Sequence, residues 1–218
     1  MALTYPLSRA NFMDLLPIGE QSHNLPQSME LNRTGGGEQL GADLGDRLWQ
    51  GKITLGRLLR TEAGRPEMLI DLLAQAGRTF LVHDTRRPWP LLDPNGTIFG
   101  ASTPTIHTLS GDPRELRITG LPATYVLSPG DYFSFQYGSS PVRYALHRVV
   151  STTTAVAGLT PLFEVSPHIR PGAVTGTQVF FFKPACKAVI LAGSVEAGVG
   201  RRTITDGISF GYVQSLGR

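Results

Sequence analysis

The side chains that most often bind metal are few and scattered in this sequence. The five histidines, His23, His83, His107, His147 and His168, are far apart, and no two of them stand two or four residues apart. A strand or helix needs such a spacing to aim two imidazoles at one ion. The sequence therefore predicts no metal site.

Two other positions carry groups with chemical potential. His83 and Asp84 follow an expected strand, and a hydrolase that uses either residue is one hypothesis. The preferred alternative is that a strand simply ends there in polar residues. Cys186 is the only cysteine, so it forms neither an intrachain disulfide nor a cysteine-based metal site. Its apolar neighbourhood, FFFKPACKAVIL, predicts a buried thiol.

Familiar catalytic motifs are absent from the sequence. No Gly-x-Ser-x-Gly elbow occurs, and the residues before Gly51-Lys52 lack the spacing of a phosphate-binding loop. The glycine-rich run GVGRR at 198–202 enters a strand-like segment, so it offers no helix N-terminus to a phosphate. We therefore expect that the protein is not an enzyme and that it holds no cofactor.

An aromatic group allows two interpretations. It consists of Tyr132, Phe133, Phe135 and the run 180–182. These rings are either a platform for stacking the bases of a single-stranded nucleic acid or part of a hydrophobic core. Their alternation with polar residues favours the core. No run of basic residues exceeds two, so specific nucleic-acid binding is not expected.

The composition excludes several classes of protein. Among 218 residues, 41% are hydrophobic and 17% charged, and the net charge is +3, which argues against charge-driven disorder. The 25 glycines and 16 prolines are too many for a helical bundle or coiled coil and have no collagen period. No apolar stretch is long enough to span a membrane, and the N-terminus lacks the apolar core of a signal peptide. We expect many short strands, in a protein made in a reducing cytoplasm.

Alternating apolar residues predict strands through most of the chain. Residues 25–60 indicate a hairpin or meander with Gly35-Gly36-Gly37 at a mobile loop tip. About six strands are expected over 114–182, which is the strand density of a small barrel or sandwich. Residues 186–218 indicate a further hairpin, in which Gly207 makes a bulge or bend.

One helix is expected, over residues 66–76. Pro66 suits the first helical position and Gly77 suits the C-terminal stop. A single apolar stripe would need a sheet to cover it. The stripe consists of Met68, Leu69, Leu72, Leu73 and Ala76. Residues 78–83 indicate a buried strand, and 97–112 a polar connection without regular structure.

Several segments together resemble a known family. They are LWQGKITLGRLL, the short helix with its glycine stop, RTFLVHDTRRPWP, LSPGDYFSF, VRYALHRVV and LTPLFEVSPHIRPGAVTGTQVFFFKPACKAVI. In this order they are similar to the distal tail proteins of long-tailed (siphovirus-type) bacteriophages and of related gene-transfer particles. The resemblance covers about residues 40–190. The long 97–112 connection and the glycine-rich 35–45 loop depart from the pattern of that family.

The resemblance implies a fold and a division into domains. The fold would be mainly β, with a ring-forming β-sandwich domain that carries one short helix and an inserted small β-barrel, OB-like or galectin-like. The sandwich domain would contain residues 1–105 plus 184–218, and the barrel module residues 106–183. Strands near 203–213 would complete the sheet that covers the helix.

The resemblance also implies a function. It indicates a structural virion protein that forms a ring, usually of six copies, at the distal end of the tail, assembled in the host cytoplasm. The ring would join the tail tube to the hub or baseplate, and the barrel could contact a host-surface carbohydrate. The alternative is a ligand-binding β-barrel module for carbohydrate or single-stranded nucleic acid.

Arginine is much commoner than lysine in this chain, which suits contacts between subunits. Extended segments such as 1–24 and 84–96 could lie across a neighbouring subunit. An equally good explanation for the arginine content is a GC-rich genome. The candidate subunit-interface residues are Arg33, Glu38, Trp49, Arg57, Arg86, Arg87 and Trp89.

Overall fold

The computed structural model of the protein describes residues 3–217 and confirms the expected mainly β fold class, with 39% of residues in strands, 9% helical and one α-helix. The chain divides into two compact units. The barrel unit contains 1–15, 77–188 and 215–218, and the sheet unit contains 16–76 and 189–214. These boundaries differ from those of the expected domains, 1–105 plus 184–218 and 106–183, and the expected division stays a prediction.

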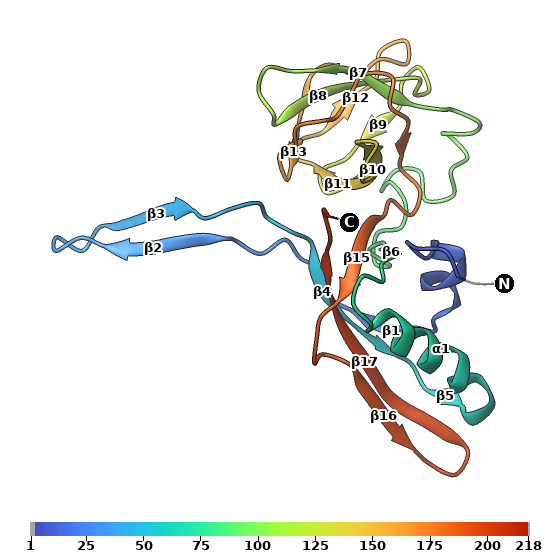
Figure 1. The fold of residues 1–218 in the computed structure, drawn as a ribbon. Coiled ribbons are helices and arrows are strands. Elements are labelled where there is room, and N and C mark those ends of the chain that lie inside the picture. Colours follow the sequence, from blue (N-terminus) through green and yellow to red (C-terminus); the bar gives the residue numbers. More distant parts are fainter. Residues whose placement is uncertain (1–2, 218) are drawn as a thin grey trace. The chain divides into compact units, whose positions relative to one another are not determined.

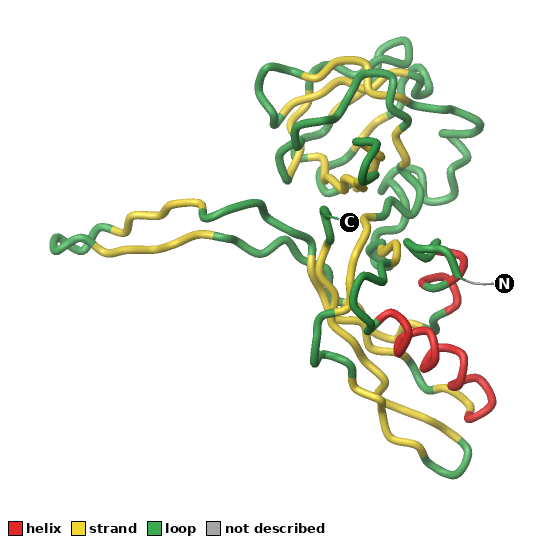
Figure 2. The backbone as a smooth tube through the Cα atoms, in the orientation of Figure 1, coloured by secondary structure: helices red, strands yellow, loops and turns green. Residues whose placement is uncertain are grey.

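The secondary structure is dominated by short strands (Figures 1 and 2). The helices are η1 (Arg9–Asn11) and η2 (Met13–Leu15), both 3₁₀, and α1 (Arg60–Leu73). The strands of the sheet unit are β1 (Ile18–Gln21), β2 (Met29–Arg33), β3 (Gln39–Asp43), β4 (Gln50–Leu55), β5 (Leu58–Leu59), β16 (Glu196–Gly200) and β17 (Ile204–Gln214). The remaining strands are β6 (Phe80–Val82), β7 (Thr105–Leu109), β8 (Glu115–Thr119), β9 (Val126–Leu127), β10 (Tyr132–Tyr137), β11 (Arg143–Val149), β12 (Thr153–Thr154), β13 (Phe163–Ser166), β14 (Val179–Phe180) and β15 (Cys186–Ile190).

The barrel unit is built on a sheet that nearly closes on itself. Its strand order is β14-β10-β11-β13-β8-β7, and the two end strands approach each other again. The amide of Ile106 donates to the carbonyl of Thr177 at 2.9 Å, and the amide of Val179 donates to the carbonyl of Pro104 at 2.9 Å. Closure of this kind pairs the polar groups of the end strands within the unit.

Alternation along the barrel strands gives the barrel its core. Phe133 and Phe135 on β10 and Ala145 and Val149 on β11 are all buried there. Phe181 lies in the same cluster. The strands expected over 114–182 are therefore confirmed, and their inward-facing residues form one hydrophobic cluster.

A strand pair outside the barrel sheet belongs to the same unit. Strand β6 pairs antiparallel with β15, with Val82 opposite Cys186, and Leu7 pairs in parallel with Phe80. Residues 80–82 are thus the buried strand expected over 78–83.

The sheet unit is built around β17, the longest strand. Strand β4 pairs with its C-terminal half, and β1 pairs with β4. Strands β16 and β5 pair with its N-terminal half from either side. Ile53, Ile208, Phe210 and Tyr212 share one face of this sheet and are buried. Helix α1 packs against β5 and β17 and buries Leu69, Ile70 and Leu73. Met68 and Ala76 of the expected apolar stripe are exposed, so that part of the stripe was wrong.

The helix begins earlier than expected. It runs over 60–73, so Pro66 is its seventh residue and the expectation that it opens the helix is wrong. The buried stripe starts at Ala63, and the carboxylate of Glu62 accepts a hydrogen bond from the amide of Leu59 at the helix start. The burial of Ala63 and the hydrogen bond of Glu62 stabilise the helix more than the missing N–H of Pro66 destabilises it. Gly77 has the left-handed φ of +80°, but it follows the helix end by several residues.

Two further expectations need correction. The connection 97–112 contains a strand, β7, because the alternating side chains of 105–109 pair with β8 and Ile106 enters the barrel core. Gly207 makes no bulge, since the pairing of β16 with β17 keeps one register past it. Gly207 and Gly198 lie opposite each other, with φ values of +81° and +74°.

Candidate functional site

The most unusual surface of the molecule is a two-stranded hairpin in the sheet unit, residues 25–48, here called the arm (Figure 1). Within residues 3–217, strands β2 and β3 pair only with each other, from Met29 opposite Asp43 to Arg33 opposite Gln39. The turn is closed by Thr34, whose amide donates to the carbonyl of Glu38 at 2.9 Å. The hairpin expected within 25–60, with Gly35-Gly36-Gly37 at its tip, is confirmed, but the expected glycine-rich loop 35–45 contains strand β3.

The arm exposes leucines on both of its faces. Residues opposite each other in an antiparallel pair share a face, so Leu31 lies with Gly41 on one face and Leu40 lies with Asn32 on the other. Leu31, Leu40 and Leu44 are 53%, 55% and 67% exposed. A hairpin without a third strand or a covering layer is only marginally stable in water. The arm therefore has both the edges and the apolar groups that a partner would cover.

The base of the arm is firmly built. The imidazole of His23 stacks on the indole of Trp49, with ring centroids 4.8 Å apart and planes 6° from parallel. Nδ1 of His23 lies 2.6 Å from the hydroxyl oxygen of Tyr212. The guanidinium of Arg47 donates to the carbonyl of Leu25 at 2.7 Å and so ties one leg of the arm to the other. The arm thus starts from a fixed position in the sheet unit.

Gly51 allows the chain to close up at this base. A Cβ at this position would lie 1.9 Å from the carbonyl oxygen of Ser22 and 2.7 Å from the hydroxyl of Tyr212. Any side chain would therefore push strand β4 away from the residues that precede the arm. The glycine of the Gly51-Lys52 pair is explained by packing.

The seven candidate interface residues lie in four places. Arg33 and Glu38 stand at the tip of the arm and are exposed. Arg57 is exposed in the sheet unit, where its Nε lies 3.3 Å from the carboxylate of Asp206. Trp49 is completely buried, so its assignment to an interface is corrected: the indole packs within its own subunit. The large aromatic side chain suggested a binding residue, but it fills the core beneath the arm.

Arg86, Arg87 and Trp89 lie together in the proline-rich segment 84–94 of the barrel unit. Together with Pro129 and Asp131 they line a hollow of about 270 Å³. Trp89 is 42% exposed there. The structure thus brings three of the candidate residues into one surface.

Buried carboxylates hold this irregular segment in place. Asp84 accepts from the amide and the guanidinium of Arg86, with the ion pair at 2.9 Å. Asp131 accepts from the amides of Leu91 and Ser128, at 2.9 and 2.8 Å, while burial raises its pKa. Asp84, which was a catalytic candidate, is therefore engaged in structure.

Two of the five histidines, His83 and His147, are buried in the barrel unit, whereas His107 and His168 are exposed. Burial lowers the pKa of His83 to about 4. His147 stacks against Phe133 and Phe135, and its Nδ1 lies 2.8 Å from the carbonyl oxygen of Pro167. Burial lowers its pKa to about 4 as well. Both imidazoles are thus held neutral at pH 7.

Cys186 is a core residue, as expected. Its side chain is completely buried, and burial raises the pKa of the thiol to about 12. The aromatic group is also mostly core: Phe133, Phe135 and Phe181 are at most 2% exposed. The interpretation as a base-stacking platform is therefore wrong for these rings.

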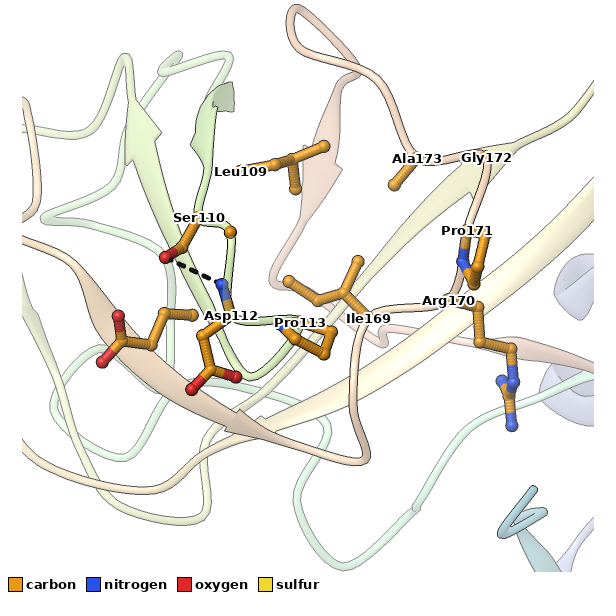
Figure 3. A pocket seen from close by; sticks show the side chains of 11 residues that line it. Leu109, Ser110, Asp112, Pro113, Ile169, Arg170, Pro171, Gly172 and Ala173 are labelled. Atoms are coloured by element: carbon orange, nitrogen blue, oxygen red, sulfur yellow. Dashed lines mark hydrogen bonds between the residues drawn. The ribbon is translucent and has the colours of Figure 1, made fainter. Parts of the chain in front are cut away.

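A second hollow of about 210 Å³ lies on the barrel between 109–115 and 169–173 (Figure 3). Leu109, Pro113 and Ile169 give it an apolar wall. Asp112 is 2.6 Å from the guanidinium of Arg114, whose hydrogen bonds lower the pKa of the carboxyl to about 2. The polar groups at this rim are thus engaged in the turn itself.

Among residues 3–217, no group of three or more histidine, cysteine, aspartate or glutamate side chains is arranged to hold a metal ion. Within the same residues, no helix has the length and apolar character needed to cross a membrane. The exposed leucines of the arm were missed from the sequence, since 35–45 was interpreted as a glycine-rich loop and the second strand of the arm lies in it.

Comparisons with known proteins add no name to this description. Neither the protein-family models nor the curated proteins that were searched contain a match to the chain.

Proposed function

We propose that this chain is a structural subunit that assembles with copies of itself into a ring at the distal end of a phage-type tail. The ring joins the tail tube to the hub or baseplate. The observation that carries the self-assembly is the arm, a hairpin whose leucines and strand edges are left exposed by its own subunit. The resemblance to distal tail proteins supplies the place of the ring in a virion.

The physical basis for assembly is the coverage of the arm. Burying three leucines that are more than half exposed removes apolar area from water, which is the main driving force of association. Each open edge of β2 and β3 also offers unpaired amides and carbonyls to a neighbouring chain. The fixed base at His23 and Trp49 reduces the conformational freedom that the arm would lose on docking.

Light scattering after size-exclusion chromatography tests the assembly. We expect a closed oligomer, which the family resemblance sets at six copies, and rings in negative-stain images. Replacing Leu31, Leu40 and Leu44 with serine should convert it to monomers. The matched control replaces Val156, Leu162 and Val174, three exposed apolar residues of the barrel unit, with serine and should stay assembled. A wild-type protein that stays monomeric at high concentration would overturn the proposal.

The position in the virion needs a separate experiment. The wild-type ring should bind purified tail-tube protein on one face and hub protein on the other, as seen by co-sedimentation and imaging. Failure to bind either protein, with the ring intact, would remove the tail assignment and leave the self-assembly. The alternative, a ligand-binding barrel for carbohydrate or single-stranded nucleic acid, came from the strand pattern of 114–182 and stays a prediction. We do not propose it, because Phe133, Phe135 and Phe181, rings that could have stacked on such a ligand, are buried in the core.

A further inference from the structure

A second unpartnered surface lies on the sheet unit, where β16, β17 and β5 run side by side. Cross-strand pairing places Val199 opposite Asp206 and Leu59 opposite Ile204. Residues 204 and 206 share a face of β17, so all four side chains lie on that face. Leu59 and Val199 are 54% and 67% exposed. This face is here called the end patch.

Arginines surround the end patch. Arg57 lies on it and pairs with Asp206 at 3.3 Å. Arg60 follows Leu59, and its amide donates to the carbonyl of Thr203 in the β16–β17 turn. Arg201 and Arg202 form that turn and are exposed.

The charge of the end patch follows from these groups. Four arginines and two carboxylates, those of Asp206 and Glu62, lie on or around the patch. The patch therefore carries more positive than negative charge. Exposed apolar side chains with arginine around them are typical of protein–protein contact surfaces.

The arm has the complementary character. Its strands and turn, residues 29–43, carry Glu30, Glu38 and Asp43 against the single base Arg33. Its apolar groups are leucines, as described above. Both surfaces thus combine exposed aliphatic side chains with charge, negative on the arm and positive on the end patch. Such complementarity favours the matched contact over contacts between like surfaces.

The two surfaces lie at opposite ends of the sheet. The arm joins the sheet where Gln50 pairs with Val213, whereas the end patch surrounds Ile204 at the start of the same strand. Nine residues of extended chain separate Ile204 from Val213, about 30 Å at roughly 3.3 Å per residue. The arm would have to fold back along the whole sheet to reach the end patch of its own chain. A second copy can supply the end patch without such a fold-back.

We propose that the arm of one copy docks on the end patch of the next copy. This inference rests on the proposed self-assembly and names the surfaces that form it. Because the contact joins two different surfaces, each copy gives one and receives one, and repetition closes into a ring. Leucines of the arm cover Leu59 and Val199, while Glu30, Glu38 and Asp43 face the arginines.

Charge reversal tests the contact. The arm variant carries Glu30→Lys, Glu38→Lys and Asp43→Lys, and the patch variant carries Arg60→Glu, Arg201→Glu and Arg202→Glu. Arg57 is left unchanged so that its ion pair with Asp206 remains. At low salt each variant alone should associate about tenfold or more weakly than the wild type, because like charges then meet. A control with Glu20→Lys, Asp71→Lys and Glu164→Lys changes the net charge by the same amount as the arm variant, but at positions outside the two surfaces. This control should assemble normally.

Mixing the two variants gives the decisive result. In an equimolar mixture, the basic arm of one variant meets the acidic patch of the other, and the acidic arm meets the basic patch. We expect rings to return and to contain both chains in equal amounts, as shown by native mass spectrometry. Circular dichroism checks the folding of each variant. If a reversed variant is unfolded, each substituted position carries glutamine instead of the lysine or glutamate. The measurement is then the loss of association of each glutamine variant alone.

The outcomes separate the two proposals. A wild type that does not assemble overturns the proposed function. If the wild type assembles and each variant alone also assembles, the contact between arm and patch is overturned, while the proposed ring remains. Variants that fail to assemble both alone and in the mixture also overturn the contact, since the reversed charges then do not face each other.

Discussion

The barrel and the arm are made of similar short strands, yet they treat their side chains and edges in opposite ways. The barrel brings its end strands together through hydrogen bonds such as that from Ile106 to Thr177, and its apolar residues enter a common core. The arm leaves both edges open, and Leu31 and Leu40 point from its two faces without cover. A strand whose edge hydrogen bonds and apolar contacts are made within the chain stabilises the fold. A strand that leaves them unmade is available to a partner.

The largest expected effect tests the barrel side of this comparison. Phe133→Ala should destabilise the barrel unit by about 3–5 kcal/mol, because the ring is fully buried and leaves a cavity. Urea denaturation followed by circular dichroism measures it. The exposed Phe180 in the same barrel is the control, and Phe180→Ala should cost much less. Equal losses for the two variants would contradict the placement of Phe133 in the core.

A pH titration tests the barrel core through His147. Its pKa is lowered to about 4 in the folded protein, against 6.5 for an ordinary histidine. Above pH 6.5 both states are neutral and stability is complete. As the pH falls from 6.5 to 4, only the unfolded state takes up the proton, so about 3 kcal/mol is lost.

The readout of this titration is the free energy of unfolding at a series of pH values. His83 has the same direction of shift and adds to the slope. His147→Gln should make the pH dependence shallower while the contribution of His83 remains. An unchanged slope in this variant would show that His147 is not neutral in the fold.

A smaller effect is expected at the junction between the sheet and the arm. Gly51→Ala should destabilise the sheet unit by about 1–3 kcal/mol, since the new methyl group would overlap the carbonyl of Ser22. Hydrogen exchange should show faster opening of β4 and β17. Gly35→Ala in the arm turn has nothing within 4 Å and serves as the control. Equal protection in both variants would argue against the close approach at Gly51.

The smallest effect on folding is expected in the arm itself. Replacing Leu31, Leu40 and Leu44 with serine should change the stability of the isolated subunit by no more than about 0.5 kcal/mol, because these side chains are exposed in it. The measurement is thermal unfolding at a concentration below that of assembly. A large loss there would mean that the arm packs on its own subunit, which would break the comparison with the barrel.

Sequence reasoning succeeded where the pattern is local. The alternation through Phe133 and Phe135 predicted strands of the barrel, and the glycine run predicted the arm turn. It failed where distant segments decide. Trp49 gives no local sign that it will stack on His23, which in turn stacks with Tyr212, because these residues are far apart in the chain. The helix start was misplaced because burial of Ala63 outweighed the preference of Pro66.

The candidate site was predictable only in part. Arg33, Glu38 and Arg57 are on the surface, as an interface requires, and stay predictions as contact residues. The leucines of the arm were overlooked because the glycine-rich segment 35–45 predicted a loop, and because a strand pattern does not show whether anything covers the strand. That information comes from the pairing, in which β2 and β3 pair only with each other among residues 3–217.

The complete burial of Cys186 has a practical consequence for labelling. Its thiol is inaccessible and its pKa is raised to about 12, so maleimide reagents should leave the native protein unmodified. A cysteine introduced at Gly36, in the exposed turn of the arm, would then be the single reactive thiol. A fluorophore attached there would report by its anisotropy whether the arm moves freely or is docked. One chain position would thus follow the assembly in real time.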